Sequence, residues 1–400
     1  MTGDSSRPGG ADVPVVESLR GLSPAERLRR VAAGRGLSAA ECAALAAGGL
    51  GIDDADRLIE NVVGLHALPL GVALHLVVNG RRRLVPMAIE EPSVVAGLSN
   101  AAKMLAAGGG VESTASAPLM ISQVQLMDVP DPEAAARVVL DARVALLAAC
   151  DAADPALVGA GGGARDVQVR RLDPAGPGDP LGPMLVVHLV VDVREAMGAN
   201  AVNTMAERVA PELERLTGGR ACLRILTNLA DRRTVAARGR VPLGALARGG
   251  FAGEDVARGI EAASVFAERD PYRAATHNKG IFNGIDALLL ATGQDWRAVE
   301  AGGHAFAARG GRYGPLSVWR VRAGMLEGEL TMPMAVGLIG GAVRAHAGVR
   351  AALGILGAAG AADLAEVAAA VGLAQNLAAL RALASEGIQA GHMRLHRRKG

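Results

Sequence analysis

The sequence predicts an α/β protein in which a small domain is inserted into a larger one. Its 400 residues are too many for one ordinary core and indicate two or three domains. Half of the residues are hydrophobic but only 2% are aromatic, so the core must consist mainly of Ala, Val, Leu and Ile. A regular succession of strand and helix patterns between residues 111 and 220 marks the inserted domain.

The inserted domain, residues 111–220, is expected to contain a sheet covered by helices. Apolar runs and helical periodicity predict strands at 124–129, 167–172, 184–193 and 221–227, and helices at 132–150 and 200–216. In chain order this is β-α-β-β-α-β, the ferredoxin-like split motif, with the last strand at the domain boundary. Three consecutive glycines, at 108–110, fit a hinge at the other boundary.

The larger domain is expected at residues 16–110 and 221–375. Ser23-Pro24 is typical of a helix start, and Ser38 with Glu41 has the spacing of a capping box. A further helix is expected at 93–107. Residues 1–15 are typical of a disordered leader without a signal-peptide pattern, and residues 376–400 of a short helical C-terminal flap.

Residues 61–80 resemble a membrane span in one respect, because none of them is Asp, Glu, Lys or Arg. They contain Pro69 and Gly71, however, and end in Asn79-Gly80, a pair that favours a hairpin turn because both residues tolerate positive φ. We therefore expect two buried strands here and no membrane segment.

Charge and cysteine content argue against several classes of protein. The net charge is +2 without large blocks of one sign, which gives no footprint for nucleic acid or an anionic membrane surface. Cys42, Cys150 and Cys222 lie too far apart for a zinc site or a disulfide framework, and they fit a reducing compartment. We expect a cytoplasmic protein that acts on a small molecule without a metal ion.

Two glycine-containing stretches are candidates for binding a dinucleotide. Gly159-Ala-Gly161-Gly-Gly-Ala164 matches the G-x-G-x-x-A fingerprint, but a predicted helix precedes it and a strand follows it. This order is the reverse of what the fingerprint needs, so a loop is favoured. Arg194-Glu195-Ala196-Met197-Gly198-Ala199-Asn200 follows a strand and opens a helix, where free N–H groups attract phosphate. From the residues alone, a plain turn capped by Asn200 is the favoured interpretation.

Further polar residues interrupt apolar surroundings, and each has two interpretations. Glu90-Glu91-Pro92-Ser93 fits a helix cap, or an acid with a raised pKa in a partly dry site. Residues 272–280 fit a site or a solvated loop. Asp295 follows an apolar run, as residues at the end of a strand often do, and it also fits a helix N-cap. A lone histidine such as His392 is more often structural or exposed than catalytic. Together they supply two carboxylic acids, a lysine and a histidine, enough for acid-assisted reduction of a carbonyl.

Six motifs occur in order between residues 60 and 392. They are Glu60-Asn-Val-Val-Gly64, Pro86-Met-Ala-Ile-Glu-Glu-Pro-Ser-Val-Val-Ala96, Glu195-Ala-Met-Gly-Ala-Asn200, His277-Asn-Lys-Gly280, Asp295-Trp-Arg-Ala-Val-Glu300 and Gly387-Ile-Gln-Ala-Gly-His392. In this order they resemble hydroxymethylglutaryl-CoA reductase, and the soluble bacterial class II enzymes in particular. The resemblance runs from about Arg20 to the C-terminus, and six ordered motifs are far more specific than any one pattern.

The resemblance implies a four-electron, two-hydride interconversion of hydroxymethylglutaryl-CoA and mevalonate plus CoA, through mevaldehyde. Its implied catalytic residues are Glu91, Lys279, Asp295 and His392. In that assignment Lys279 polarises the carbonyl, Glu91 exchanges a proton and is linked to Lys279 by Asp295, and His392 protonates the departing thiolate. The residues expected to hold the substrate are Ser93, Arg273, Asn376 and, for CoA, Arg20. The direction, isoprenoid synthesis or mevalonate catabolism, stays open.

The resemblance also implies a nicotinamide cofactor in the ferredoxin-like domain and a homodimer, or a higher homo-oligomer, with the active site at the subunit interface. The expected cofactor-binding residues are Asp154, Glu195, Met197, Gly198, Asn200 and Asn228. Asp154 aligns with the aspartate that contacts the adenosine ribose in NAD-using members. Its charge would repel a 2′-phosphate, so NAD is expected rather than NADP.

Two departures from the family pattern bear on activity. Glu195 stands where the family usually has Asp, which keeps the charge but lengthens the reach. The chain ends at Gly400, shortly after His392, where class II enzymes usually continue as a small mobile domain. A non-catalytic CoA- or nucleotide-binding relative with a truncated flap is therefore the alternative to an active reductase.

Overall fold

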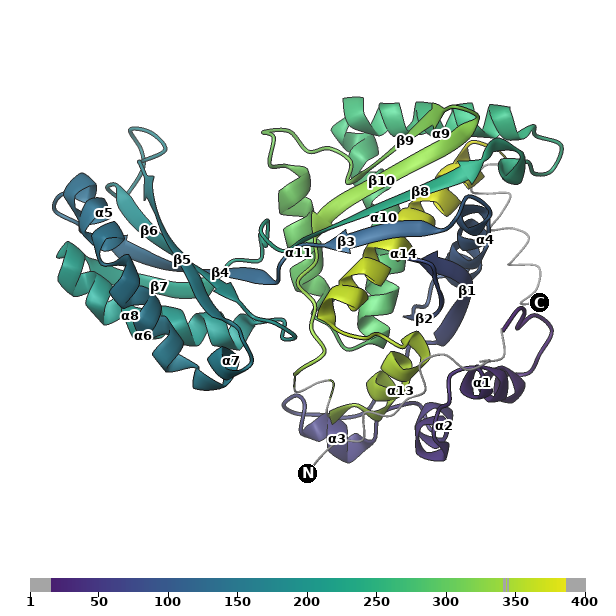
Figure 1. Cartoon of the computed structure of the whole chain (residues 1–400), viewed down its shortest axis with the longest axis horizontal. Helices are drawn as coiled ribbons and strands as arrows, with labels where there is room; N and C mark the ends of the chain where they lie inside the picture. The colour runs from purple at the N-terminus through teal and green to yellow at the C-terminus, as the bar shows by residue number, and fades with distance from the viewer. Residues whose placement is uncertain (1–15, 341–342, 344, 386–400) are drawn as a thin grey trace.

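The computed structural model describes residues 16–340, 343 and 345–385, and folds them into two domains (Figure 1). The large domain contains a six-stranded sheet of order β2-β1-β3-β8-β10-β9, and the small domain a four-stranded sheet of order β5-β6-β4-β7. The small sheet is antiparallel throughout, and with its helices it has the ferredoxin-like topology. The predicted fold class, α/β with an inserted ferredoxin-like domain, is therefore confirmed.

The large sheet begins with a hairpin whose turn is Asn79-Gly80, as the sequence predicts. Residues 61–69 form no strand, so the uncharged stretch contributes one strand and not two; the hairpin's second strand begins after the turn. The strands of this sheet are β1 (Leu70–Val78), β2 (Arg81–Ala88), β3 (Val111–Ala115), β8 (Thr234–Pro242), β9 (Ser317–Arg322) and β10 (Met325–Pro333).

Helix α14 (Ala361–Leu383) runs through the core of the large domain, behind the sheet in Figure 1. It packs against α4 (Val94–Ala107) and α10 (Pro271–Ala291), and glycines permit the close approach. A Cβ at Gly284 of α10 would lie only 2.8 Å from Cβ of Gln375. Among the described helices α14 alone is long and apolar enough to span a membrane, yet 78% of its most apolar window is buried in the protein. It is placed as a core helix.

The remaining helices of the large domain lie around this core. They are α1 (Pro24–Ala33), α2 (Ala39–Ala46), α3 (Ile52–Asp56), α9 (Gly253–Arg269), α11 (Trp296–Ala307), α13 (Ala347–Leu356) and the 3₁₀ turn η1 (Leu243–Leu246). Ser23 caps α1, and Ser38 forms the predicted capping box with Glu41 at the start of α2. Local sequence signals therefore set these helix starts correctly.

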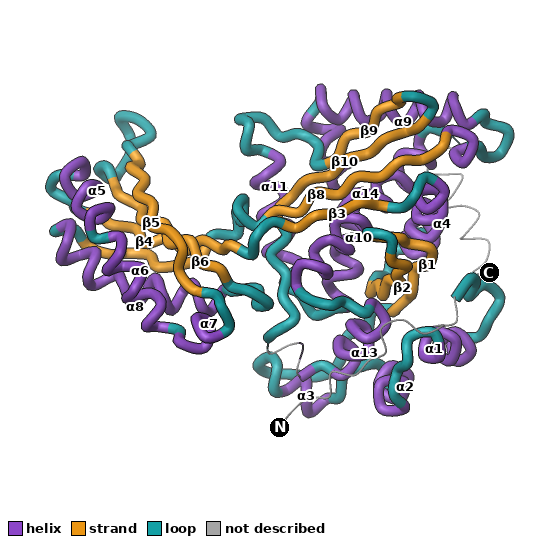
Figure 2. Tube along the Cα trace, viewed as in Figure 1, coloured by secondary structure: helices purple, strands orange, loops and turns teal. Residues whose placement is uncertain are grey.

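The small domain has helices on one face of its sheet (Figure 2). Its strands are β4 (Leu119–Met127), β5 (Gly163–Leu172), β6 (Met184–Asp192) and β7 (Arg220–Leu226). Its helices are α5 (Pro132–Asp141), α6 (Arg143–Ala153), α7 (Pro155–Gly159) and α8 (Ala199–Thr217). The single helix predicted at 132–150 is in fact two, with a break at Ala142. Of the Gly-rich stretch at 159–164, residues 160–162 form the turn between α7 and β5, whereas Gly159 ends the helix and Gly163 begins the strand; helix, turn and strand follow in the predicted order.

The predicted domain limits need correction. Strand β3 pairs with β1 and β8 in the large sheet, so the small domain starts after residue 115 and not at 111. Strand β7 belongs to the small sheet, so that domain ends after residue 226 and not at 220. The glycines at 108–110 are no hinge: a Cβ at Gly108 would collide with the carbonyl of Arg240, so they allow close packing.

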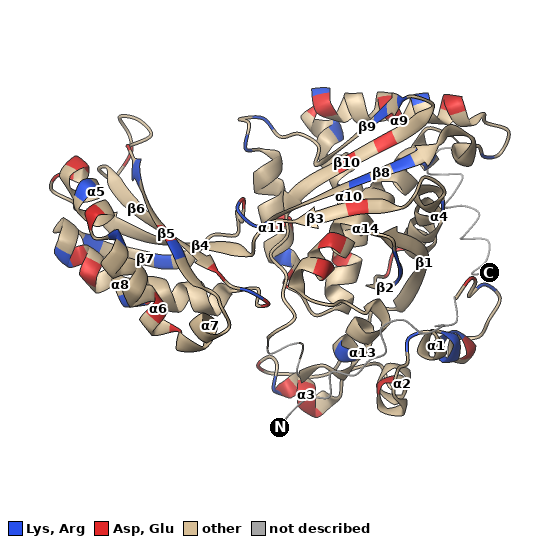
Figure 3. Cartoon of the chain, viewed as in Figure 1, with Lys and Arg blue, Asp and Glu red and all other residues tan. Residues whose placement is uncertain are grey.

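The C-terminal limit also differs from the prediction. Helix α14 continues to Leu383, so no boundary falls between residues 375 and 376. Residues 386–400, which include His392 of the predicted flap, and the predicted leader at 1–15 lie outside the described residues. Figure 3 shows charged residues of both signs scattered over both domains, as the balanced composition predicts.

Candidate active site

An ion pair joins the loop after β2 to the middle of α10. Nζ of Lys279 lies 3.1 Å from Oε2 of Glu91, and the two side chains are 62% and 34% exposed. The N-cap of α4 is Ser93, in a left-handed conformation with φ 80° and no side-chain cap bond. The helix-cap interpretation of Glu90 and Glu91 is therefore wrong for Glu91, whose carboxylate turns to the lysine. An acid and a cation thus meet where a ligand can reach them.

A cavity of about 290 Å³ lies beside this ion pair, between α4, α10 and α14. The polar residues that line it are Glu91, Ser93, Asn100, Arg248, Asn283, Gln375 and Arg381. Oε1 of Gln375 is buried and has no hydrogen-bond partner among the described residues, so it is ready to accept a bond from a ligand. Ser93 lines this cavity, and its contact with substrate stays a prediction.

Sequence reasoning missed Asn283 and Gln375. Asn283 stands four residues after Lys279 on α10, a spacing that puts both side chains on one face of a helix. That spacing was a usable signal, because a second polar residue on the lysine face interrupts an otherwise apolar run. Gln375 carried no such signal, since it lies inside a long apolar helix and its role depends on the packing of three helices.

The polar stretch at 272–280 is part of α10 and not a solvated loop. Asp270 caps the helix by accepting from the N–H groups of Tyr272 and Arg273, and Pro271 occupies the first turn. Burial lowers the pKa of the Arg273 guanidinium, which is half-buried. His277 is buried, with Nε2 2.8 Å from Oγ of Ser317, and burial together with Arg273 lowers its pKa to about 4. His277 is therefore neutral at pH 7.

Asn376, predicted to contact substrate, belongs to a buried hydrogen-bond network in this structure. Its Oδ1 accepts from Oγ of Ser317 at 3.0 Å and from Nε1 of Trp319 at 2.8 Å. Its side chain is 1% exposed. The physical reason is helical rotation: neighbouring residues on α14 point about 100° apart, so Gln375 reaches the cavity while Asn376 faces the core.

Asp295 lies at the N-terminus of α11, where its Oδ1 accepts from the N–H of Ala298. The N-cap interpretation is correct. The strand-end interpretation is wrong, because the apolar run before it is the last part of α10. Lys279 stands twelve residues before the end of α10, which is roughly 18 Å along a helix that rises 1.5 Å per residue. One chain therefore brings Glu91 and Lys279 together but leaves Asp295 apart from them.

The turn between β6 and α8 contains the predicted cofactor residues Glu195, Met197, Gly198 and Asn200. Gly198 has φ 101°, and a Cβ there would lie 2.6 Å from the Val193 side chain, so only glycine fits. Gly198 is also the N-cap, without a side-chain cap bond, so the expectation that Asn200 caps the helix is wrong. The first-turn N–H groups of α8 are left for an anionic ligand.

Three further predicted site residues belong neither to this turn nor to the lining of the cavity. Asp154 caps α7 by accepting from the N–H of Leu157 at 3.0 Å. Asn228 is exposed in the loop between β7 and β8, and its carbonyl packs against Gly302 of α11. Arg20 is exposed in the turn before α1. The described residues contain no cluster of His, Cys, Asp and Glu that could hold a metal ion.

Comparison with known proteins identifies the family. The family model described as hydroxymethylglutaryl-coenzyme A reductase matches residues 23–397. The chain belongs to the hydroxymethylglutaryl-CoA reductase family. It is 50% identical over 378 residues to the 3-hydroxy-3-methylglutaryl-coenzyme A reductase of Archaeoglobus fulgidus, covering 94% of this chain and 84% of the relative. The probable reductase of Borreliella burgdorferi is 34% identical over 339 residues, covering 85% and 76% of the two chains.

Solved structures of this reductase family have the same fold. The reductase of Streptococcus pneumoniae superposes with a TM-score of 0.87 at 43% identity, covering 91% of this chain and 98% of that one. A second structure, of the class II enzyme from the same organism bound to NADPH in open conformations, gives the same values. The resemblance inferred from six sequence motifs is therefore confirmed.

Proposed function

We propose that this protein is a hydroxymethylglutaryl-CoA reductase that uses a nicotinamide cofactor. The observation that carries this proposal is the contact of Glu91 with Lys279 at the edge of a cavity large enough for an acyl-thioester. The alternative, a non-catalytic relative, is not favoured, because the acid and the lysine are both present and in contact.

Residues at the cavity and beside it have the following roles in this reaction. The Lys279 ammonium donates a hydrogen bond to the thioester oxygen and stabilises the negative charge that develops there. Glu91 supplies the proton to that oxygen as the hemithioacetal and then the alcohol form. Ser93 and Arg273 bind the hydroxymethylglutaryl group, and Gln375 accepts a hydrogen bond from the substrate. The reaction consumes two hydrides and releases CoA, whose thiolate takes a proton from His392.

The small domain fits a nicotinamide dinucleotide. The uncapped N-terminus of α8 and the glycine at 198 let a pyrophosphate approach backbone N–H groups. Met197, Asn200 and Asn228 would hold the cofactor, which supplies hydride when bound. We propose NAD rather than NADP, because a carboxylate at Asp154 disfavours a 2′-phosphate. The NADPH in the pneumococcal structure belongs to that enzyme.

We further propose a homodimer in which a second copy completes the site. Within one chain Asp295 does not reach Lys279, so the partner must bring it there. Support comes from an exposed apolar segment in the N-terminal part of the large domain. Its exposed side chains are Ile52, Leu58, Ile59, Val63, Leu65, Leu68 and Leu70. Such a patch is unusual on a monomer and fits a surface buried against a second copy.

The activity is tested by following NADH and NADPH absorbance with hydroxymethylglutaryl-CoA, and with mevalonate plus CoA. We expect turnover in both directions and a preference for NAD. The two cofactors and the two reaction directions give four combinations. If none of them shows turnover while the protein still binds CoA and NADH by calorimetry, the protein is a non-catalytic relative instead. We also propose a cytoplasmic location, which fractionation of the native cell tests.

The shared active site is tested by mixing two inactive variants. Lys279→Ala and Asp295→Asn are each expected to be inactive as homodimers. A mixed dimer contains one site with intact Glu91, Lys279 and partner Asp295, so activity should return on subunit exchange. Lys279→Ala mixed with Glu91→Gln is the matched control. Glu91 and Lys279 of one site come from the same chain, so each site of this mixed dimer contains one defect and the mixture should stay inactive. Equal recovery of activity in both mixtures, or no recovery in either mixture, would contradict the proposal that two subunits share the active site.

A further inference from the structure

Glu195 links the small domain to the N-terminus of α14. Its Oε2 accepts a hydrogen bond from the N–H of Ala361 at 2.6 Å, although the two residues are far apart in the sequence. The N-cap of α14 is Gly360, which has no side chain to bind the free N–H groups. Glu195 therefore supplies from another domain the acceptor that the helix lacks, and its charge suits the positive end of the helix dipole.

The geometry at Gly360 explains why a glutamate stands at residue 195. A Cβ at Gly360 would lie 3.2 Å from Oε2 of Glu195, so the carboxylate lies directly against the helix start. An aspartate is shorter by one methylene, about 1.5 Å, and would not reach Ala361 from the same backbone. The longer side chain thus makes a contact that the shorter one lacks.

The backbone of the Glu195 turn is itself fixed to the large domain. Arg233 is buried and donates to the carbonyls of Ala196 and Met197 at 3.1 and 3.0 Å. The N–H of Leu338 donates to the carbonyl of Glu195 at 2.9 Å. A Cβ at Gly337 would lie 2.3 Å from the backbone nitrogen of Met197, so the two segments are in close backbone contact. The turn is therefore a rigid support for the carboxylate.

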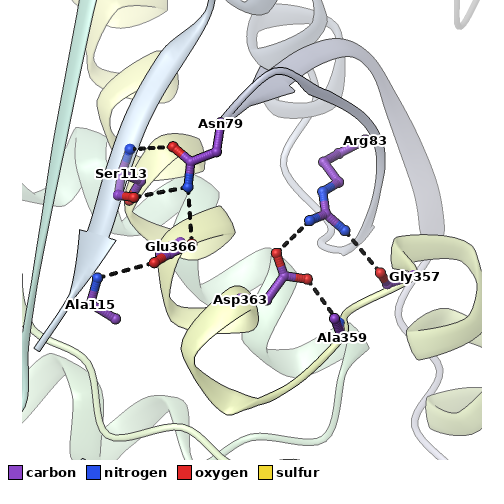
Figure 4. A network of polar contacts seen from close by, with 8 residues as sticks. All are labelled: Asn79, Arg83, Ser113, Ala115, Gly357, Ala359, Asp363 and Glu366. Carbon is purple, nitrogen blue, oxygen red and sulfur yellow. Dashed lines mark hydrogen bonds and ion pairs between the residues drawn. The ribbon is translucent and has the colours of Figure 1, made fainter. Parts of the chain in front are cut away.

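Helix α14 carries this position to the cavity. Its later turns supply Gln375 and Arg381 to the cavity wall beside Glu91. Its first turns are held by two further acidic side chains, shown in Figure 4: Asp363 pairs with Arg83, and Glu366 accepts from Asn79 and from the N–H of Ala115. These two contacts fix α14 to the large sheet, whereas Glu195 alone among the three reaches it from the small domain.

We propose that Glu195 is a positioning residue that couples the cofactor-binding turn to the substrate cavity through α14, and that its carboxylate does not bind the cofactor. Its effect on turnover rests on the proposed reductase function, but its contact with α14 does not.

Amide hydrogen exchange of the ligand-free full-length protein tests the contact directly. Glu195→Ala and Glu195→Asp should exchange the amide of Ala361 about tenfold faster than wild type, because its acceptor is lost. Glu195→Gln keeps an acceptor of the same length and should stay within about threefold. Glu207→Gln, an exposed glutamate on α8, is the matched control. An unchanged rate at Ala361 in all Glu195 variants would overturn the proposal, whether or not the protein is a reductase.

Kinetics then separate positioning from cofactor binding. In Glu195→Ala and Glu195→Asp we expect kcat to fall about tenfold while the Kd for NADH, from fluorescence titration, changes less than about threefold. Glu195→Gln should restore kcat. If the Kd for NADH weakens about tenfold or more in Glu195→Gln as well, with normal exchange at Ala361, the carboxylate is a cofactor ligand and the proposal is wrong. If the wild-type protein has no reductase activity, the proposed function is wrong. The amide exchange result then decides by itself whether Glu195 binds Ala361.

Discussion

Nζ of Lys279 lies 3.1 Å from Oε2 of Glu91 at the mouth of a cavity, and both side chains are partly exposed. An exposed ion pair of this kind contributes about 0–1 kcal/mol to stability, so its contribution to the fold is small. Its position suits a reaction, because a substrate carbonyl can take the place of the carboxylate on the ammonium. The pair therefore predicts a variant that folds well and reacts poorly.

Lys279→Ala should lower kcat by roughly 10²- to 10³-fold or more, the usual cost of removing an oxyanion donor. The melting temperature should change little. Arg238→Ala is a matched control, since Arg238 forms an exposed pair with Glu329 at 3.7 Å on the large sheet. Steady-state kinetics with circular dichroism check both variants; near-normal turnover in Lys279→Ala would remove its assigned role.

Asp154→Asn should shift cofactor preference towards NADP by about tenfold in kcat/KM, because a charge opposed to the 2′-phosphate is removed. Asparagine is the sharper test than alanine. Asp154 also caps α7, and asparagine keeps a capping oxygen, whereas Asp154→Ala loses the cap at about 1 kcal/mol. Asp154→Ala should relax the preference too, with lower stability. An unchanged NAD/NADP ratio in both variants would contradict the assignment.

The sequence predicted those features that depend on local chemistry. The capping box at Ser38, the Asn79-Gly80 hairpin and the order of strands in the small domain all follow from short-range patterns. Domain limits failed because strand partnership is non-local: nothing in residues 111–115 says which sheet they join. The assignment of Asn376 has a similar dependence, since only the packing of α14 decides whether Gln375 or Asn376 faces the cavity. Family motifs supplied Glu91 and Lys279, but no pattern places Asp295 relative to them.

A partly buried pair of carboxyl groups, Asp286 of α10 and Glu300 of α11, lies where these two helices meet. Burial, and then the neighbouring Glu300, raise the pKa of Asp286 to about 8, so the folded protein holds a proton that the unfolded chain has lost. The contribution of this site to the free energy of unfolding is therefore fully present below the pKa of Asp286 in the unfolded chain, about 4. It is lost as the pH rises through about 8, the pKa in the folded protein.

Asp286→Asn should remove this dependence, because asparagine does not titrate. Between pH 6 and pH 9 the free energy of unfolding of wild type should fall relative to the variant by on the order of 1–3 kcal/mol. Urea denaturation at both pH values measures the difference. Asp141→Asn, an exposed aspartate of α5, should follow wild type at both. A parallel pH dependence in Asp286→Asn and wild type would show that the pair does not titrate in this range.

The network around Asn376 separates a structural role from substrate binding. Removing Oδ1 leaves the buried donors of Ser317 and Trp319 without their acceptor. Asn376→Ala should therefore lower the free energy of unfolding by roughly 2–4 kcal/mol, with the KM for hydroxymethylglutaryl-CoA within about threefold of wild type. Gln375→Ala, one residue earlier, should show the opposite: a KM raised about tenfold and a smaller loss of stability, since Oε1 of Gln375 makes no hydrogen bond within the described structure. Urea denaturation and initial rates at a temperature where both variants are folded give the comparison. A raised KM with unchanged stability in Asn376→Ala would return that residue to the substrate site, because a core network cannot be deleted without cost to the folded state.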